Sequence, residues 1–301
     1  MKDICLAGGK GASLGQMTQL NIPVPPGFVV LAPAFDHFLE ETDLNVEIKA
    51  RLAKINVQDL NSVDRASNEI MGIIYNANFP KDIEREILKE YKKLKASFVA
   101  VRSSATAEDS SVASWAGELE SYLNTTKADL LENIKKCWAS LFTPRAIFYR
   151  FEKGLENDKV SVAVVVQKMI QSEVSGICFT VHPITKDKNQ MIIEAGYGLG
   201  EAIVGGEITP DSYVVEKDTK NILDKNISEQ GTMISRAANG NKKIPVAKKR
   251  RGLQKLSDER IKELADICFI IEKSYNYPQD IEWAFEKGKF FIVQSRPITT
   301  L

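Results

Sequence analysis

The sequence predicts a mixed protein of the α+β or α/β class, built as two halves with a cleft between them. Helical spacing dominates the first 95 residues, and short β-rich runs dominate from Ser161 onward. The 301 residues are 44% hydrophobic and 27% charged, a composition typical of globular proteins with about two domains. We expect an N-terminal subdomain over residues 1–165 and a sheet-rich C-terminal subdomain over residues 166–301.

Charge and hydropathy exclude several classes of protein. Lys+Arg and Asp+Glu both number 40, so the formal net charge of zero gives no general attraction to nucleic acid or anionic membrane. The first residues, Met1 to Cys5, lack an apolar signal core, and no apolar run approaches the roughly 18 residues that span a bilayer. We expect a cytoplasmic protein without a nucleic-acid or membrane partner.

The cysteines and histidines are not expected to carry chemistry. Four cysteines are widely spaced without a C-x-x-C pair, which favours buried, reduced thiols over disulfides or a zinc site. His37 lies in a helix-like run and His182 just before a proline, so we interpret both as structural.

The first third is predicted as one glycine turn followed by helices. A short strand should lead into the turn Gly8-Gly9-Lys10-Gly11, with a helix after it that Pro23 ends. Helices then continue to about Lys95, with apolar residues at helical spacing over 83–94.

The middle of the chain combines one strand with one long helix. Residues 98–101 form a compact β-type run that ends at Arg102. Helical spacing follows between Asp129 and Phe142, where Thr126 with Asp129 predicts a capping box, and Pro144 should end or bend the helix.

The second half is predicted as sheet with one late helix. The β-type runs cover 162–166, 176–180, 191–194 and 212–215. The late helix places Ile261, Leu264, Cys268 and Ile271 on one face. A basic run at 248–251 is interpreted as a solvated connection.

The last two runs, 280–285 and 290–297, should pair as a hairpin. A three-residue loop, Glu286-Lys287-Gly288, would place Phe285 opposite Lys289 and Asp280 opposite Gln294. Alternation then separates two faces. The polar face would hold Asp280, Glu282, Gln294 and Arg296, and the apolar face Ile281, Trp283, Phe285, Phe291 and Val293.

The polar face offers the groups that hold a divalent cation and a phosphate chain. Hard cations take oxygen ligands, and the fork of arginine donors matches phosphate. The alternative is a hairpin with one face in water, and a loop one residue shorter or longer would separate Glu282 from Gln294.

Two further motifs suit phosphate. The turn at Gly8–Gly11 combines close backbone approach with Lys10 beside a helix N-terminus, although it is not a P-loop and a simple surface turn is the alternative. Arg102-Ser103-Ser104 follows a predicted strand, where donors would project from the strand end, and a hydroxyl-rich turn is its alternative.

Two more segments bear on a nucleotide. Residues 196–201 contain three glycines at a spacing that does not fit a dinucleotide fingerprint. Gln167, Lys168 and Met169 end a strand whose backbone could meet an adenine edge, although ordinary strand packing explains them equally well.

Taken in order, these motifs resemble one family over essentially the whole chain. It is the N-terminal nucleotide-binding domain of the phosphoenolpyruvate synthase, pyruvate phosphate dikinase and rifampin phosphotransferase group. The blocks that carry the resemblance are 8–15, 23–28, 101–109, 116–118, 198–201, 280–283 and 294–297.

The resemblance implies an ATP-grasp fold, with two subdomains that clamp Mg-ATP. It implies that Lys10 and Arg102 contact the phosphates, with Gly117 and Ser121 contributing from a neighbouring loop. It places Gln167 and the following backbone, including Met169, at the adenine. Glu282 and Gln294 would hold Mg²⁺, Asp280 would support them, and Arg296 would stabilise the transferring phosphoryl groups, so that Arg296, Lys10 and Arg102 are the catalytic candidates.

The resemblance also implies what this stretch of chain lacks. Family members continue into a domain whose histidine accepts the phosphoryl group, and neither His37 nor His182 lies in such a motif. We therefore expect an ATP-dependent dikinase-type phosphotransferase subunit or excised domain that works with a phosphohistidine domain in cis or in trans.

Alternatives to this interpretation are a rifampin phosphotransferase- or phenylphosphate synthase-like system, a catalytically silent nucleotide sensor, and another ATP-grasp ligase.

Overall fold

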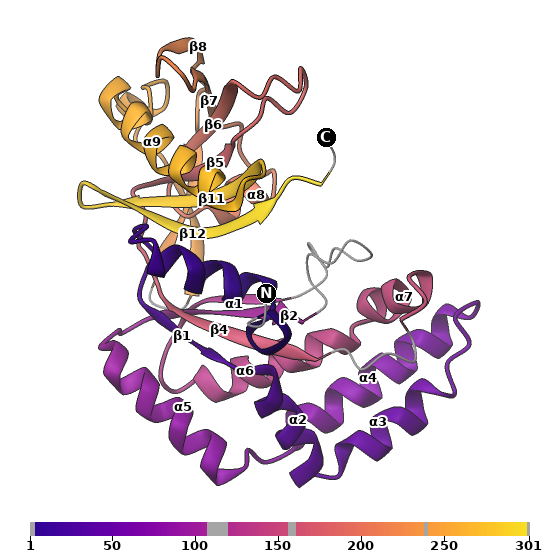
Figure 1. The fold of residues 1–301 in the computed structure, drawn as a ribbon. Coiled ribbons are helices and arrows are strands. Elements are labelled where there is room, and N and C mark those ends of the chain that lie inside the picture. Colours follow the sequence, from indigo (N-terminus) through magenta and orange to yellow (C-terminus); the bar gives the residue numbers. More distant parts are fainter. Residues whose placement is uncertain (1–3, 107–119, 156–160, 238–239, 300–301) are drawn as a thin grey trace. The chain divides into compact units, whose positions relative to one another are not determined.

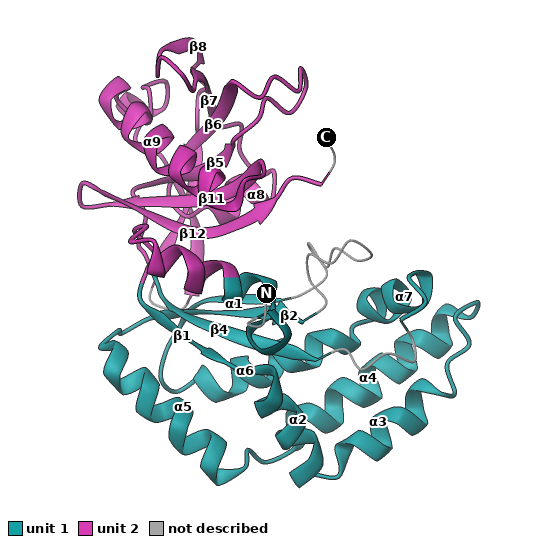
Figure 2. Ribbon diagram, viewed as in Figure 1, with its two compact units in different colours: residues 1–12, 26–169 teal, residues 13–25, 170–301 magenta. Residues whose placement is uncertain are grey.

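The computed structural model describes residues 4–106, 120–155, 161–237 and 240–299. The chain forms two compact units, coloured separately in Figure 2: unit 1 takes residues 1–12 and 26–169, and unit 2 takes residues 13–25 and 170–301. Each contains helices and an antiparallel sheet. The mixed α/β class predicted from the sequence is confirmed.

Unit 1 is built on a four-stranded sheet of order β1-β4-β2-β3 with antiparallel neighbours. Its strands are β1 (Gly27–Val30), β2 (Val99–Ala105), β3 (Ser121–Thr125) and β4 (Val162–Lys168). Its helices, labelled in Figure 1, are α2 (Ala32–Glu41), α3 (Leu44–Leu52), α4 (Leu60–Asn76), α5 (Lys81–Leu94), α6 (Leu130–Ala139) and α7 (Pro144–Glu152). A 3-10 turn, η1 (Ser140–Phe142), lies between α6 and α7.

The core of unit 1 centres on Trp138 of α6, which is fully buried. The rings of Phe35, Phe38 and Phe79 surround it at centroid distances of 5.4, 5.0 and 5.2 Å. Valines from one face of β2 and β4 join this cluster. That face of the sheet is therefore part of the hydrophobic core, and polar side chains such as Arg102 and Gln167 lie on the other face.

The first helix, α1 (Ile4–Gln19), breaks at Gly8, where φ is 70° and ψ is 171°. Residues 4–7 are helical, so the short strand predicted there is wrong. A brief apolar run fits one helical turn as well as a strand, and no vacant sheet edge pairs with it. Residues of α1 up to Ala12 belong to unit 1, and residues from Ser13 belong to unit 2.

Three other predicted features of unit 1 need correction. Thr126 and Asp129 do not form a capping box, because α6 begins at Leu130 and the Thr126 hydroxyl donates to the Asp129 carboxylate at 2.6 Å. Pro144 does not end α6 but begins α7, where proline is compatible with the first helical position. Strand β2 continues to Ala105, so Arg102 lies within the strand and not at its end.

Unit 2 contains a six-stranded sheet of order β12-β11-β5-β6-β7-β8, again antiparallel throughout. Its strands are β5 (Val174–Phe179), β6 (Gln190–Tyr197), β7 (Asp211–Glu216), β8 (Ile222–Asn226), β11 (Gln279–Glu286) and β12 (Lys289–Pro297). A separate hairpin joins β9 (Thr232–Ala237) to β10 (Gly240–Pro245), and the remaining elements are α8 (Glu201–Val204), η2 (Lys248–Arg250) and α9 (Asp258–Tyr275).

Helix α9 packs on β6, β7 and β11 (Figure 1). The predicted helix face is confirmed, because Ile261, Leu264, Cys268 and Ile271 are all buried. The second face of the sheet carries no helix of comparable length within the described part of unit 2, and most of its side chains are half-buried or buried.

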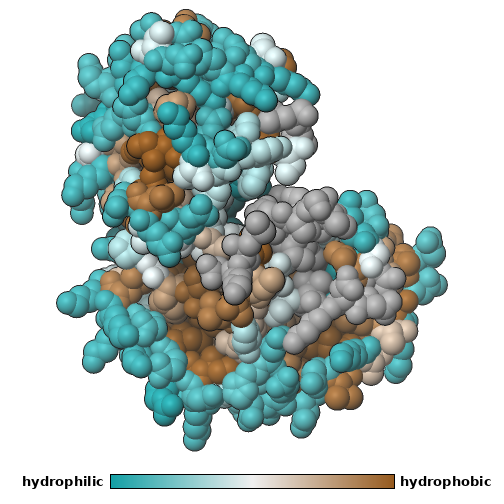
Figure 3. Space-filling model, in the orientation of Figure 1, coloured by the Kyte–Doolittle hydropathy of each residue, from teal (hydrophilic) through white to brown (hydrophobic). Residues whose placement is uncertain are grey.

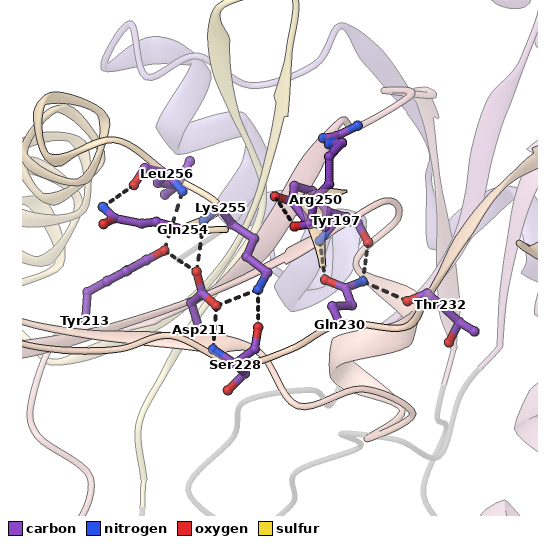
Figure 4. Close-up of polar contacts among 10 residues, drawn as sticks. All are labelled: Tyr197, Asp211, Tyr213, Ser228, Gln230, Thr232, Arg250, Gln254, Lys255 and Leu256. Atoms are coloured by element: carbon purple, nitrogen blue, oxygen red, sulfur yellow. Dashed lines mark hydrogen bonds and ion pairs between the residues drawn. The ribbon is translucent and has the colours of Figure 1, made fainter. Parts of the chain in front are cut away.

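A network of buried polar groups fastens the segment around β9 and β10 to the sheet (Figure 4). Asp211 and Lys255 form an ion pair at 2.8 Å in which neither side chain is exposed. Asp211 also accepts from the Tyr213 hydroxyl at 2.7 Å. Nearby, the Gln230 amide accepts from the backbone N–H of Tyr197 at 2.8 Å and donates to its carbonyl at 3.0 Å, as a neighbouring strand would.

The basic run at 248–251 is exposed apart from half-buried Arg251, yet it is not simply solvated. The Arg250 guanidinium lies 4.4 Å from the centre of the Tyr197 ring, and Arg251 Nε donates to the Val246 carbonyl at 3.0 Å. Cation–π stacking and a backbone hydrogen bond thus hold two members of this run.

Cys137, Cys178 and Cys268 are buried free thiols, as predicted, but Cys5 is exposed. His37 lies 3.1 Å from the Asp82 carboxylate, and His182 Nδ1 accepts from the backbone of Ile184 and Thr185, which fixes a local turn.

Hydrophilic residues form much of the surface seen in Figure 3, with hydrophobic patches on each unit. No helix among the described residues is long and apolar enough to cross a membrane.

Candidate functional site

In unit 1 the glycine turn is held against β2. Gly11 N–H donates to the Ser104 hydroxyl at 3.1 Å, and that hydroxyl donates to the Ala7 carbonyl at 2.8 Å. Gly8 lies so close to Ser104 that an added Cβ would be 2.2 Å from its Oγ and 2.3 Å from its carbonyl oxygen. Only glycine fits this position, both for space and for its backbone conformation.

This contact places Lys10 beside the Arg-Ser-Ser segment. Lys10 Nζ donates to the Ser103 carbonyl at 2.7 Å, so its ammonium lies next to the backbone that follows Arg102. The two phosphate-binding candidates predicted from motifs 92 residues apart are therefore brought together by α1 and β2.

Ser121 and Gln167 join Arg102 on one face of the sheet. Arg102 pairs with Ser121 of β3 and with Val165 of β4, and Gln167 pairs with Ala100, two residues before Arg102. Residues two apart on a strand share a face. Gln167 is buried, Met169 is half-buried, and Met169 N–H donates to the Phe98 carbonyl at 3.0 Å.

Gly117 lies outside the described residues. The other unit 1 candidates, Lys10, Arg102, Ser121, Gln167 and Met169, all lie on or beside the sheet. Ser104, which sequence reasoning did not select as a site residue, holds the glycine turn in place. The motif quoted it only as part of a hydroxyl-rich segment.

In unit 2 the terminal hairpin exists, but its register differs from the prediction. The loop has two residues, Lys287 and Gly288, with φ of 50° and 77°, and Glu286 pairs with Lys289. Two positive φ values are typical of a type I′ turn, whose twist matches that of the flanking strands. The predicted pairs Phe285–Lys289 and Asp280–Gln294 are wrong.

A bulge at Val293 restores the predicted grouping of the four polar residues on one face. Trp283 pairs with Ile292, whereas Glu282 pairs with Gln294, so Val293 is the extra residue. Beyond it, Asp280 pairs with Arg296. Asp280, Glu282, Gln294 and Arg296 therefore share one face, as predicted, because the pairing moved by two residues and not by one.

The apolar face of the hairpin is also partly different. Phe291 pairs with Ala284 on the polar side, and Phe290 and Ile292 pair with Phe285 and Trp283. The Trp283 and Phe290 rings meet edge to face at 5.7 Å. The prediction of Phe291 on the apolar face is wrong, because the two-residue loop shifts the pairing by one residue up to the bulge, and Val293 itself is the unpaired bulge residue.

Asp280 and Arg296 form the best-defined contact of this face. Arg296 Nε and one terminal nitrogen donate to the same oxygen, Asp280 Oδ2, at 2.8 and 2.7 Å. The second oxygen, Oδ1, is buried and has no hydrogen-bond partner among the described residues. Burial raises the pKa of Asp280, and Arg296 offsets part of that shift.

Glu194 of β6 lies on the same face, and sequence reasoning did not select it. It pairs with Ile177 of β5, which in turn pairs with Glu282, so the two glutamates share a face two strands apart. Burial raises the pKa of Glu194, and the negative charge of Asp280 adds to the shift. No local motif marks Glu194, because its position depends on the strand order.

Chemically, unit 2 offers carboxylate and amide oxygens with one guanidinium, and unit 1 offers an ammonium, a guanidinium and a hydroxyl. No group of three His, Cys, Asp or Glu side chains within the described ranges converges as a complete metal site. A cation on the unit 2 face therefore needs further oxygens from a ligand or water, which is how proteins commonly bind Mg²⁺.

Comparison with known proteins agrees with the predicted resemblance. The chain matches the family described as "Pyruvate phosphate dikinase, AMP/ATP-binding domain" over residues 4–301. It is 46% identical to a probable phosphoenolpyruvate synthase of Methanocaldococcus jannaschii, over 100% of this chain and 26% of that protein. The probable phosphoenolpyruvate synthase of Archaeoglobus fulgidus is 48% identical, over 99% of this chain and 40% of its own length.

Rifampicin phosphotransferase of Bacillus subtilis is 38% identical over 99% of this chain and 35% of that protein. A solved structure, D-alanyl-alanine synthetase A of Vibrio cholerae, aligns over 97% of this chain and 55% of that one at 12% identity. Its TM-score of 0.29 is too low to assign a fold. The chain spans between 26% and 45% of the length of the curated relatives that it matches.

Proposed function

Because the chain belongs to the pyruvate phosphate dikinase AMP/ATP-binding domain family, we propose that it binds Mg-ATP for a phosphoenolpyruvate synthase-like phosphotransferase. It delivers phosphoryl groups to a histidine on another domain or a partner chain. The observation that carries the proposal is the pairing of Glu282 with Gln294 and of Asp280 with Arg296 on one face of a rigid ribbon. The fold proposed for the two units is ATP-grasp.

Each candidate has a proposed role. Lys10 and Arg102 contact the phosphates together with Gly117 and Ser121, and Gln167 with the backbone to Met169 meets the adenine. Arg296 stabilises charge on the transferring phosphoryl groups, a role that depends on placement and not on covalent chemistry. The Asp280 contact supports this role because it fixes the direction of the guanidinium.

The residues present fit a magnesium ion. Glu282 and Gln294 are adjacent across the two strands and both are half-buried, so their oxygens can serve a hard cation that a ligand completes. Bound there, Mg²⁺ would neutralise phosphate charge.

The identities favour the synthase branch over the antibiotic-modifying one by a small margin, since synthase-named archaeal relatives are 39% to 48% identical and the rifampicin phosphotransferase is 38% identical. A rifampicin phosphotransferase-like acceptor remains the second candidate.

Calorimetry with ATP in the presence and absence of Mg²⁺ tests the proposal. The folded chain should bind ATP with Mg²⁺ and lose most of that affinity in EDTA. Glu282→Gln should weaken Mg-ATP binding, whereas Glu216→Gln, on β7 away from the hairpin, should not. A folded chain that binds no ATP under either condition contradicts the proposal.

Transfer is tested with γ- and β-labelled ATP and the histidine-bearing domain of a full-length relative. Acid-labile label on that domain supports the phosphotransferase, and binding without transfer supports a nucleotide sensor.

A further inference from the structure

Glu194 extends the polar face of the hairpin into the centre of the six-stranded sheet. The register runs from Gln294 through Glu282 and Ile177 to Glu194, and then to Ser212 of β7. Neighbouring strands are about 4.8 Å apart, so Glu194 lies about 10 Å from Glu282 across the sheet. Its carboxylate is half-buried and makes no hydrogen bond or ion pair with another residue of the described chain.

Asp280, Glu282 and Glu194 place three carboxylates on this face, beside Arg296. Arg296 is the cation paired with Asp280, and it uses only one of the two Asp280 oxygens. The other oxygen, Oδ1, is buried and has no hydrogen-bond partner among the described residues, and Asp280 as a whole is 9% exposed.

These carboxylates would stabilise a divalent cation bound at the face. Carboxylates within about 10 Å attract a double positive charge even when they do not touch it, and the attraction is stronger at a half-buried surface than in bulk water. Asp280 Oδ1 is buried without a hydrogen-bond partner among the described residues, so positive charge added at this face would stabilise it.

We propose that Glu194 is a positioning residue for the magnesium ion of the nucleotide site: it raises the affinity for Mg²⁺ through its charge, together with Asp280, without being a ligand. This inference rests on the proposed function, because it assumes Mg-nucleotide binding at Glu282 and Gln294. It gives β6, in the middle of the sheet, a role in a site whose other proposed residues in unit 2 lie on the terminal hairpin.

The test is a titration with Mg²⁺ at a fixed concentration of a non-hydrolysable ATP analogue, with binding measured by calorimetry. Glu194→Gln removes the charge and keeps the shape. Coulomb's law gives a roughly 4-fold effect on a divalent cation about 10 Å away in water. We expect half-saturating Mg²⁺ to rise about 3- to 10-fold, with nucleotide affinity at saturating Mg²⁺ unchanged.

Two variants complete the design. Glu194→Asp keeps the charge and should restore most of the Mg²⁺ affinity. Glu216→Gln removes a carboxylate from the same face at the far end of β7, four residues from Ser212, and should leave the titration unchanged. The effect of Glu194→Gln should also shrink in high salt, because screening weakens charge interactions over this distance.

The outcomes separate the two proposals. If the wild-type chain binds no Mg-nucleotide, both fail. If it binds and Glu194→Gln titrates as wild type, this inference alone fails. A loss of Mg²⁺ affinity beyond about 100-fold, unrescued by Glu194→Asp, also overturns it, because so large an effect means direct ligation and not action through charge.

Discussion

Gly8 is the residue on which the placement of Lys10 depends. Its backbone, with φ of 70° and ψ of 171°, lies in a region that side chains exclude, and its missing Cβ leaves room for Ser104. The turn can then pass close to β2, where Lys10 reaches the Ser103 carbonyl. One position without a side chain thus sets the direction of a phosphate-binding candidate.

Gly8→Ala is expected to lower both stability and nucleotide affinity. Backbone strain alone costs about 1–3 kcal/mol, and the clash with Ser104 forces the turn away from β2. Urea denaturation measures the first effect and Mg-ATP calorimetry the second.

Gly15→Ala is the matched control in the same helix. Gly15 is exposed, and nothing lies within 4 Å of an added Cβ. Alanine there should be neutral or should stabilise the chain by up to about 1 kcal/mol. Equal effects of the two substitutions would show that Gly8 has no special role.

The terminal hairpin shows how a loop and a bulge compensate each other. The loop is one residue shorter than predicted, and the bulge at Val293 adds one residue back to β12. A single change would have turned Gln294 and Arg296 to the helix-covered face, because side chains alternate along a strand. Together the two changes preserve the polar face.

The connection between β7 and α9 depends on the buried pair of Asp211 and Lys255. Lys255→Met would leave the Asp211 carboxylate buried without its cation, and such a loss destabilises by about 3–5 kcal/mol. Thermal and urea unfolding of the variant measure this effect.

Lys225→Met provides a comparison with a second Lys–Asp pair. Lys225 contacts Asp258 at 2.6 Å, but both side chains are well exposed. Exposed pairs contribute about 1 kcal/mol or less, so this variant should stay close to wild type. If both lysine variants lose the same stability, burial is not what makes the Asp211 pair important.

The ligand-free chain carries carboxylates that folding makes harder to ionise. Burial raises the pKa of both Asp280 and Glu194, so the folded chain binds protons that the unfolded chain releases. Stability from these groups is complete below their unfolded pKa of about 4 and is lost as pH rises through the raised folded values. At neutral pH these ionised carboxylates therefore lower the stability of the folded chain, and a bound cation can offset this loss.

Glu194→Gln should consequently gain stability relative to wild type as pH rises from about 4 to 7, with no difference at the acidic end. Urea midpoints of both proteins across this range, without Mg²⁺ or nucleotide, provide the measurement. Parallel midpoint curves for the two proteins would contradict the raised pKa of Glu194.

Local patterns in the sequence determined much of what the structure contains. Helical spacing identified the buried face of α9, alternation grouped Asp280 with Glu282 and Gln294 with Arg296, and the motifs identified the family. These features depend on residues a few positions apart, where geometry has a period of 3.6 or 2.

Only the tertiary structure decided the rest. Glu194 lies two strands from Glu282 because β5 pairs with both β6 and β11, and Gly8 meets Ser104 because α1 packs on β2. Likewise, residues 13–25 belong to unit 2 although they precede almost all of unit 1. Strand order and packing join segments far apart in the chain, and no local period encodes which segments will meet.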